Sequence, residues 1–97
     1  MAKATEIDIE ARAKAGRENF LKGYNCAQSV IAAFADIYPS DDIDTLLRLS
    51  ASFGGGMGRL RMTCGAASGM FMLAGLENGS ATPGNMEART RNYARVQ

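Results

Sequence analysis

The stretch SFGGGMGRLRMTCGAASG, residues 52–69, decides how the rest of the chain is organised. It holds six of the 11 glycines, one of the two cysteines and two arginines. Glycine loses more conformational entropy on folding than any other residue, so a chain uses it densely where the backbone turns tightly or approaches another group closely. Two interpretations follow: a mobile surface loop before a helix with small packing residues, or a loop that presents Cys64 at the start of a helix for redox chemistry or metal binding.

Helical patterns flank this stretch on both sides, and no segment alternates like a strand. Helices are expected over residues 5–22, 25–38, 41–52, 64–76 and 85–97. The residues expected to cap them are Thr5, Asn25, Ser40 or Asp41, Thr63 and Asn85. The predicted fold class is all-α: a compact bundle of four to five short helices with a Gly-rich loop between helices 3 and 4. Residues 1–97 are expected to form one domain, because 97 residues fit one domain rather than two.

Apolar periodicity indicates how the helices pack. The buried face expected for the first helix carries Ile9, Ala13, Gly16 and Phe20. Arg12 falls among charged residues on the opposite face, which we expect to be solvated. The second helix is apolar around most of its girth, so we expect it to be central and largely buried. In the fourth helix, Gly65 and Gly69 form a small-residue pair that would let another helix backbone approach closely.

Composition and charge narrow the classes of function. The net charge of +1 gives no electrostatic argument for a nucleic-acid partner or an anionic membrane surface. The N-terminal residues contain no apolar run, so we expect a cytoplasmic protein without a membrane span. The absence of histidine removes the commonest general base and the Cys–His type of activated thiol. Any chemistry must come from the two thiols, other polar side chains or a bound cofactor.

Both cysteines follow a residue expected to cap a helix, Asn25 before Cys26 and Thr63 before Cys64. Each thiol is therefore expected at the first helical position, where unpaired N–H groups and the helix dipole favour a thiolate. Cys26 and Cys64 are the candidate redox thiols. We hypothesise that they lie close together and either cycle between dithiol and disulfide or share a metal ion. The alternative is a structural or oligomerising helical module, in which each cysteine is a small apolar residue.

The glycine run gives a second candidate site, for an anion, made of Gly54, Gly55, Gly56, Arg59 and Arg61. Neither phosphate-loop pattern is met, because arginines stand where those patterns need glycine. Successive glycine N–H groups and the two arginines could still cradle an anion, which makes an anion-binding module the third hypothesis. Alternatively, the arginines are solvated, or they lie near the Cys64 thiolate and stabilise it.

Three motifs occur in order along the chain: GYNCAQ at residues 23–28, FGGGMG at 53–58 and CGAASG at 64–69. Together they resemble the C_GCAxxG_C_C family, whose members are described as redox-active, and the resemblance covers about residues 10–97. Members of this family carry four cysteines, and related domains in split-Soret cytochromes hold an iron–sulfur cluster. The resemblance makes Cys26 and Cys64 the first two of the four. It implies an iron–sulfur cluster or a metal ion as cofactor of the four-cysteine form.

The last two family cysteines would lie beyond the helix that reaches Gln97. We therefore expect either a C-terminally truncated chain or a member that has lost half of the site. Two thiolates cannot hold a cluster alone, although a homodimer could pool two pairs across a symmetry axis. The resemblance leaves open the redox partner, the substrate and whether the protein is an enzyme.

Overall fold

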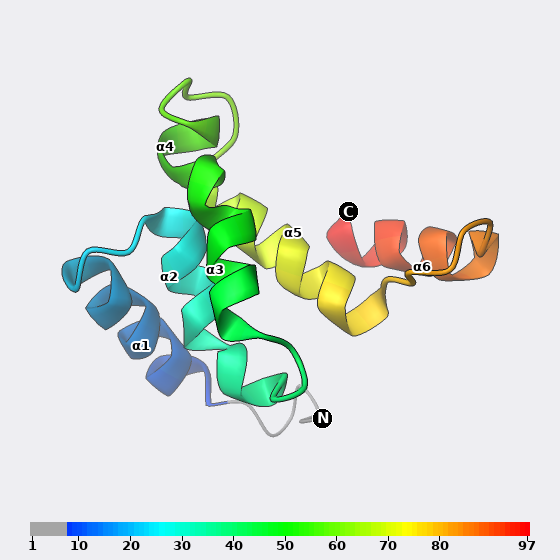
Figure 1. Ribbon diagram of the computed structural model, residues 1–97, viewed down its shortest axis with the longest axis horizontal. Helices are drawn as coiled ribbons and strands as arrows, with labels where there is room; N and C mark the ends of the chain where they lie inside the picture. Colours follow the sequence, from blue (N-terminus) through cyan, green and yellow to red (C-terminus); the bar gives the residue numbers. More distant parts are fainter. Residues whose placement is uncertain (1–7) are drawn as a thin grey trace.

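The computed structural model describes residues 8–97, which contain helices and connecting segments but no strand (Figure 1). The longer helices are α1 (Ile9–Leu21), α2 (Cys26–Ala33), α3 (Ile43–Ser50), α5 (Gly65–Asn78) and α6 (Met86–Val96). The shorter elements are η2 (Ala35–Ile37), η3 (Ala51–Phe53) and α4 (Gly54–Met57). This confirms the predicted all-α bundle. The Gly-rich segment lies between the third and fourth of the longer helices, as expected, and includes the single turn α4.

Two of the predicted helix starts are confirmed by their side-chain caps. The side-chain oxygen of Asn25 accepts a hydrogen bond from the N–H of Gln28 at 2.9 Å. The side-chain oxygen of Gln28 accepts one in return from the N–H of Asn25 at 3.1 Å, which completes a capping box. At α6, the side chain of Asn85 accepts from the N–H of Ala88 at 3.0 Å. These caps fix where α2 and α6 begin.

Other helix starts differ from the prediction. Asp42 caps α3, rather than Ser40 or Asp41, because its carboxylate is the one that accepts hydrogen bonds from the first turn of the helix. The cap expected at Thr5 lies outside the described residues, and α1 is capped instead by Asp8. Several acidic and hydroxyl residues precede each of these helices, so the local sequence does not single out one of them.

Helix α2 lies at the centre of the bundle, as predicted, and contacts α1, α3 and α5. Helix α5 packs along α2 in the same direction: Gly65 lies beside Cys26, and Gly69 lies beside Ala27 and Val30. A Cβ atom added at Gly65 would lie 2.9 Å from the Cβ of Cys26, and one added at Gly69 would lie 2.9 Å from the carbonyl oxygen of Ala27. The predicted small-residue pair therefore permits this close contact. Parallel packing brings the N-terminal ends of α2 and α5 together.

Helix α1 is held against α2 partly by a polar side chain that was predicted to be solvated. Arg12 donates a hydrogen bond to the carbonyl oxygen of Ala33 at 2.8 Å and forms an ion pair with Asp36. Two apolar residues expected to be buried, Ile9 and Phe20, are 79% and 54% exposed. Both expectations were wrong. Helical periodicity does not account for the reach of the long Arg12 side chain. Ile9 and Phe20 stay exposed because α1 packs mainly against α2, which covers only part of its apolar face.

Helix α6 contacts mainly α5 and extends away from the other helices (Figure 1). Its one buried residue is Ala88, and most of its remaining surface is exposed. Within residues 8–97, no helix combines the length and the apolar character needed to cross a bilayer.

Candidate functional site

Both cysteines line one open pocket of about 550 Å³ at the end of the bundle where α2 and α5 begin. We call it the thiol pocket. Its lining residues are Cys26, Gly55, Gly56, Arg59, Arg61, Thr63, Cys64 and Gly65. Every predicted site residue except Gly54 therefore contributes to one pocket. Gly54 lies against Asn25 instead, and a Cβ atom added to it would lie 2.7 Å from three atoms of that side chain.

Cys26 is the first residue of α2, as predicted, and it is half-buried. The residues around it tie this end of α2 to the neighbouring elements. The Asn25 side-chain amide donates a hydrogen bond to the carbonyl oxygen of Ala51 at 2.8 Å. The Gln28 side-chain amide donates one to the carbonyl oxygen of Leu47 at 3.0 Å. The backbone that carries the Cys26 thiol is therefore fixed from α3 and η3.

Cys64 is exposed and lies at the N-cap of α5, one position earlier in the helix than predicted. Its ψ of 129° is not helical, so Cys64 rather than Thr63 is the residue at which the chain enters the helix. The backbone N–H groups of Ala67 and Ala66, at the start of α5, lower the pKa of the Cys64 thiol below its ordinary value. Hydrogen bonds to the charged form favour the thiolate. Cys64 is also the more exposed of the two thiols.

The Gly-rich loop follows an unusual backbone path into the pocket. Five consecutive residues, 55–59, have positive φ, and they include Met57 at 64° and Arg59 at 66°. Arg61, at 59°, is also left-handed. An L-residue other than glycine loses roughly 1 kcal/mol or more in this conformation. The loop keeps the strained residues in place through its own hydrogen bonds, among them Arg59 N–H to the carbonyl of Gly54 at 3.1 Å.

The loop arginines give the thiol pocket a positive character. The backbone N–H groups of Arg59 and Arg61 donate to the carbonyls of Gly54 and Gly55 inside the loop, so the free donors of these two residues are their guanidinium groups. Neither arginine forms an ion pair with a carboxylate of residues 8–97. No acidic residue lines the pocket. The N-terminal ends of α2 and α5 add partial positive charge from their unpaired N–H groups.

The donor set in the thiol pocket does not complete a metal site. Within residues 8–97, no group of three or more histidine, cysteine, aspartate or glutamate side chains could hold a metal ion. A structural zinc ion takes four such ligands, and an iron–sulfur cluster is commonly held by four thiolates. Cys26 and Cys64 alone do not fit the cluster or the metal ion that the family resemblance implied.

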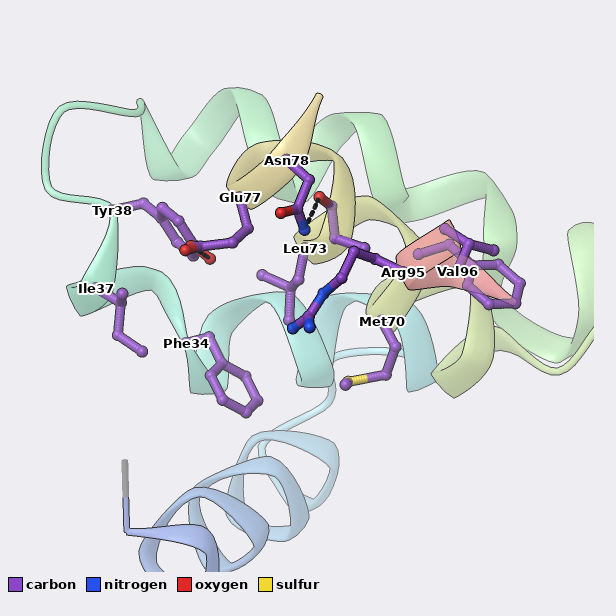
Figure 2. Close-up of a pocket in the computed structure, with 11 residues that line it drawn as sticks. Phe34, Ile37, Tyr38, Met70, Leu73, Glu77, Asn78, Arg95 and Val96 are labelled. Carbon is purple, nitrogen blue, oxygen red and sulfur yellow. Dashed lines mark hydrogen bonds between the residues drawn. The ribbon is translucent and has the colours of Figure 1, made fainter. Parts of the chain in front are cut away.

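A second cavity, of about 370 Å³, lies between η2, α5 and the end of α6 (Figure 2). We call it the apolar cavity, and its residues are Phe34, Ile37, Tyr38, Met70, Phe71, Leu73, Ala74, Glu77, Asn78, Arg95 and Val96. The Tyr38 hydroxyl donates a hydrogen bond to the Glu77 carboxylate at 2.9 Å. Burial, and then this hydrogen bond, raise the pKa of Tyr38 to about 12. Sequence reasoning missed this cavity, because residues 39 positions apart carry no local signal of their contact.

Comparison with known proteins identifies a protein family. Residues 24–97 match the model of a family described as "Putative redox-active protein (C_GCAxxG_C_C)". No curated protein and no solved structure matches the chain significantly. The matched segment is well over half of the chain and includes both cysteines, the Gly-rich loop and all of the helices that form the thiol pocket. This protein therefore belongs to the C_GCAxxG_C_C family.

Proposed function

We propose that Cys26 and Cys64 form a redox-active pair that cycles between dithiol and disulfide by exchange with a disulfide substrate. The observation that carries the proposal is that both thiols line one pocket at the joined N-terminal ends of α2 and α5. Membership of a family described as redox-active supports it. Helix N-termini favour thiolates, and thiolates are the form that reacts with disulfides.

The two cysteines take different roles in this reaction. The exposed Cys64 thiolate attacks one sulfur of the substrate RSSR, so a mixed disulfide forms and one RS⁻ leaves. The half-buried Cys26 thiol then attacks the Cys64 sulfur, and the second RS⁻ leaves. The proton of Cys26 passes to a departing thiolate. The protein loses two electrons as its disulfide forms, and the substrate gains them as it becomes two thiols.

The direct test maps the disulfide after exposure of the reduced protein to a small disulfide. Peptide mapping without reductant is expected to find the Cys26 peptide joined to the Cys64 peptide. In Cys26→Ser the reaction is expected to stop at a mixed disulfide on Cys64, because the second thiol is missing. In Cys64→Ser the remaining thiol is expected to react at least tenfold more slowly, because it is half-buried.

Alkylation of the reduced protein across a pH series provides the second measurement. The lowered pKa of the Cys64 thiol means that its thiolate is populated at lower pH, so the midpoint of its alkylation rate is expected below 9.0. The competing hypothesis, a helical module without chemistry, gives a different result. It predicts that both thiols stay free after exposure to the disulfide and that Cys64 alkylates like a cysteine in an unstructured peptide. That result would overturn the proposal.

A further inference from the structure

The positive charge of the thiol pocket bears on the charge of the ligands that can bind there. Arg59 and Arg61 are its two charged lining residues, and both are exposed. The whole chain has a net charge of only +1, so this positive charge is a local feature and not a consequence of a basic protein. A cleft lined by one sign of charge raises the local concentration of ligands of the opposite sign.

The backbone of the loop adds a second observation. Arg59 and Arg61 both have positive φ, where glycine or asparagine is the residue that the conformation favours. Gly55 and Gly56, in the same loop, also have positive φ, and there the chain uses the glycine that this conformation favours. A side chain kept in a strained conformation at a pocket suggests that the side chain is used there. The hydrogen bond from the Arg61 N–H to the carbonyl of Gly55, at 3.2 Å, helps to hold that position.

We infer that the thiol pocket selects anionic disulfides, such as short alkyl disulfides that carry carboxylates, and that Arg59 and Arg61 bind those carboxylates. The inference rests on the proposed thiol–disulfide exchange and specifies its substrate class. Guanidinium groups suit this task because they can hold a carboxylate through two parallel hydrogen bonds. The exchange itself is unchanged: Cys64 attacks the substrate, Cys26 displaces it, and two carboxylate-bearing thiols leave.

Three symmetric disulfides of nearly equal size test the inference: dithiodipropionate, which is a dianion, neutral hydroxyethyl disulfide, and cystamine, which is a dication. The rate at which each oxidises the reduced protein is divided by its rate with an unstructured peptide that carries one cysteine. This division removes the intrinsic reactivity of each disulfide. The corrected rate for the dianion is expected to exceed that for the dication about tenfold or more at low salt. The preference is expected to shrink in about 1 M salt, where the Debye length is only ~3 Å.

The double variant Arg59→Gln/Arg61→Gln is expected to lower the dianion rate, raise the dication rate and leave the neutral rate within about twofold, which follows from loss of the local charge. The control Arg89→Gln/Arg91→Gln removes the same net charge from exposed positions of α6 and is expected to keep the preference. If the double variant loses helical content, the two single substitutions replace it. If the arginines only stabilised the Cys64 thiolate, all three corrected rates would fall together.

The outcomes separate the two proposals. All three disulfides could form the Cys26–Cys64 bond at corrected rates that do not depend on the charge of the disulfide. In that case the inference of anion selection is wrong and the proposed function stands. The same holds if the preference survives in Arg59→Gln/Arg61→Gln. If none of the three disulfides joins the two cysteines, the proposed function is wrong and the inference fails with it.

Discussion

Two cavities lie at opposite ends of the same pair of helices. The thiol pocket lies where α2 and α5 begin, and it is lined by glycines, thiols and arginines. The apolar cavity lies beyond the end of α2 and along the second half of α5, and aromatic and aliphatic side chains form most of its wall (Figure 2). The helices run parallel, so the exposed N–H groups and positive dipole ends collect at one end only. The direction of the two helices therefore sets which end of the pair can stabilise a thiolate.

Loss of the close contact between α2 and α5 should have the largest effect on the free energy of unfolding. Gly69→Ala would place a Cβ atom 2.9 Å from the carbonyl oxygen of Ala27 and 3.0 Å from the Cβ of Val30, so the helices must separate. We expect a loss of about 2–3 kcal/mol in the free energy of unfolding, measured with urea. The matched control is Gly75→Ala in the same helix, where a Cβ atom meets nothing within 4 Å. Its expected effect is a gain of up to about 1 kcal/mol from helix propensity. Equal effects of the two substitutions would contradict the packing described.

A smaller effect should be confined to the thiol end. Asn25→Ala removes the cap of α2 and the hydrogen bond to the carbonyl of Ala51, so the free energy of unfolding is expected to fall by about 2 kcal/mol. Alkylation of Cys26 is expected to accelerate because its backbone is no longer held. Asn85→Ala, which removes the cap of α6, is the control and is expected to cost only about 1 kcal/mol. An unchanged Cys26 rate in Asn25→Ala would show that the cap does not position this thiol.

The apolar end can be tested through its tyrosine. Tyr38→Phe removes the hydrogen bond to Glu77, and we expect a loss of about 1 kcal/mol at neutral pH. The pKa of Tyr38 is raised from 10.0 to about 12, so the folded state binds this proton more tightly than the unfolded state does. The contribution is therefore fully present below pH 10 and is lost as the pH rises through about 12. The free energies of unfolding of wild type and Tyr38→Phe should therefore become equal at high pH, which urea denaturation at several alkaline pH values measures. The control is Tyr93→Phe, at an exposed tyrosine.

The smallest effect is expected at the Arg12–Asp36 ion pair, which joins α1 to η2. The hydrogen bond from Arg12 holds the pKa of Asp36 below its ordinary 3.8, so its contribution is present above that value and is lost as the pH falls through the lowered pKa. The Asp36 side chain is 69% exposed, and Asp36→Asn is therefore expected to cost less than about 1 kcal/mol at neutral pH. The cost should vanish in acid, and urea denaturation at both pH values measures it. A cost of several kcal/mol would mean that this pair is far less solvated than described.

Local signals in the sequence predicted the parts of the structure that depend on neighbouring residues. Asn25, with Gln28 three positions later, predicts a capping box, and Asn85 predicts the start of α6. The spacing of Gly65 and Gly69 predicted a close contact between helices. Because both cysteines follow helix-start signals, their place near helix N-termini could also be predicted, within one residue for Cys64.

Long-range and strained features could not be predicted in this way. The positive φ values of Met57 and Arg59 run against the preference of both residue types, so no local rule assigns them. The contact of Tyr38 with Glu77 and that of Arg12 with Asp36 join residues far apart in the chain. The meeting of the two thiols in one pocket depends on parallel packing of α2 and α5, which the glycine pair permits but whose direction it does not specify.

Parallel helices cannot be joined by a short connection, so the chain leaves the far end of α2 and travels back through α3 and the Gly-rich loop before α5 begins. The segment from Cys26 to Cys64, 38 positions later, therefore begins and ends at the thiol pocket. Oxidation of the pair would close this segment into a covalent ring, with α1 as one tail and α5 with α6 as the other. A protease that cut the oxidised ring once would release no fragment, whereas the same cut in the reduced chain would yield two pieces on a denaturing gel.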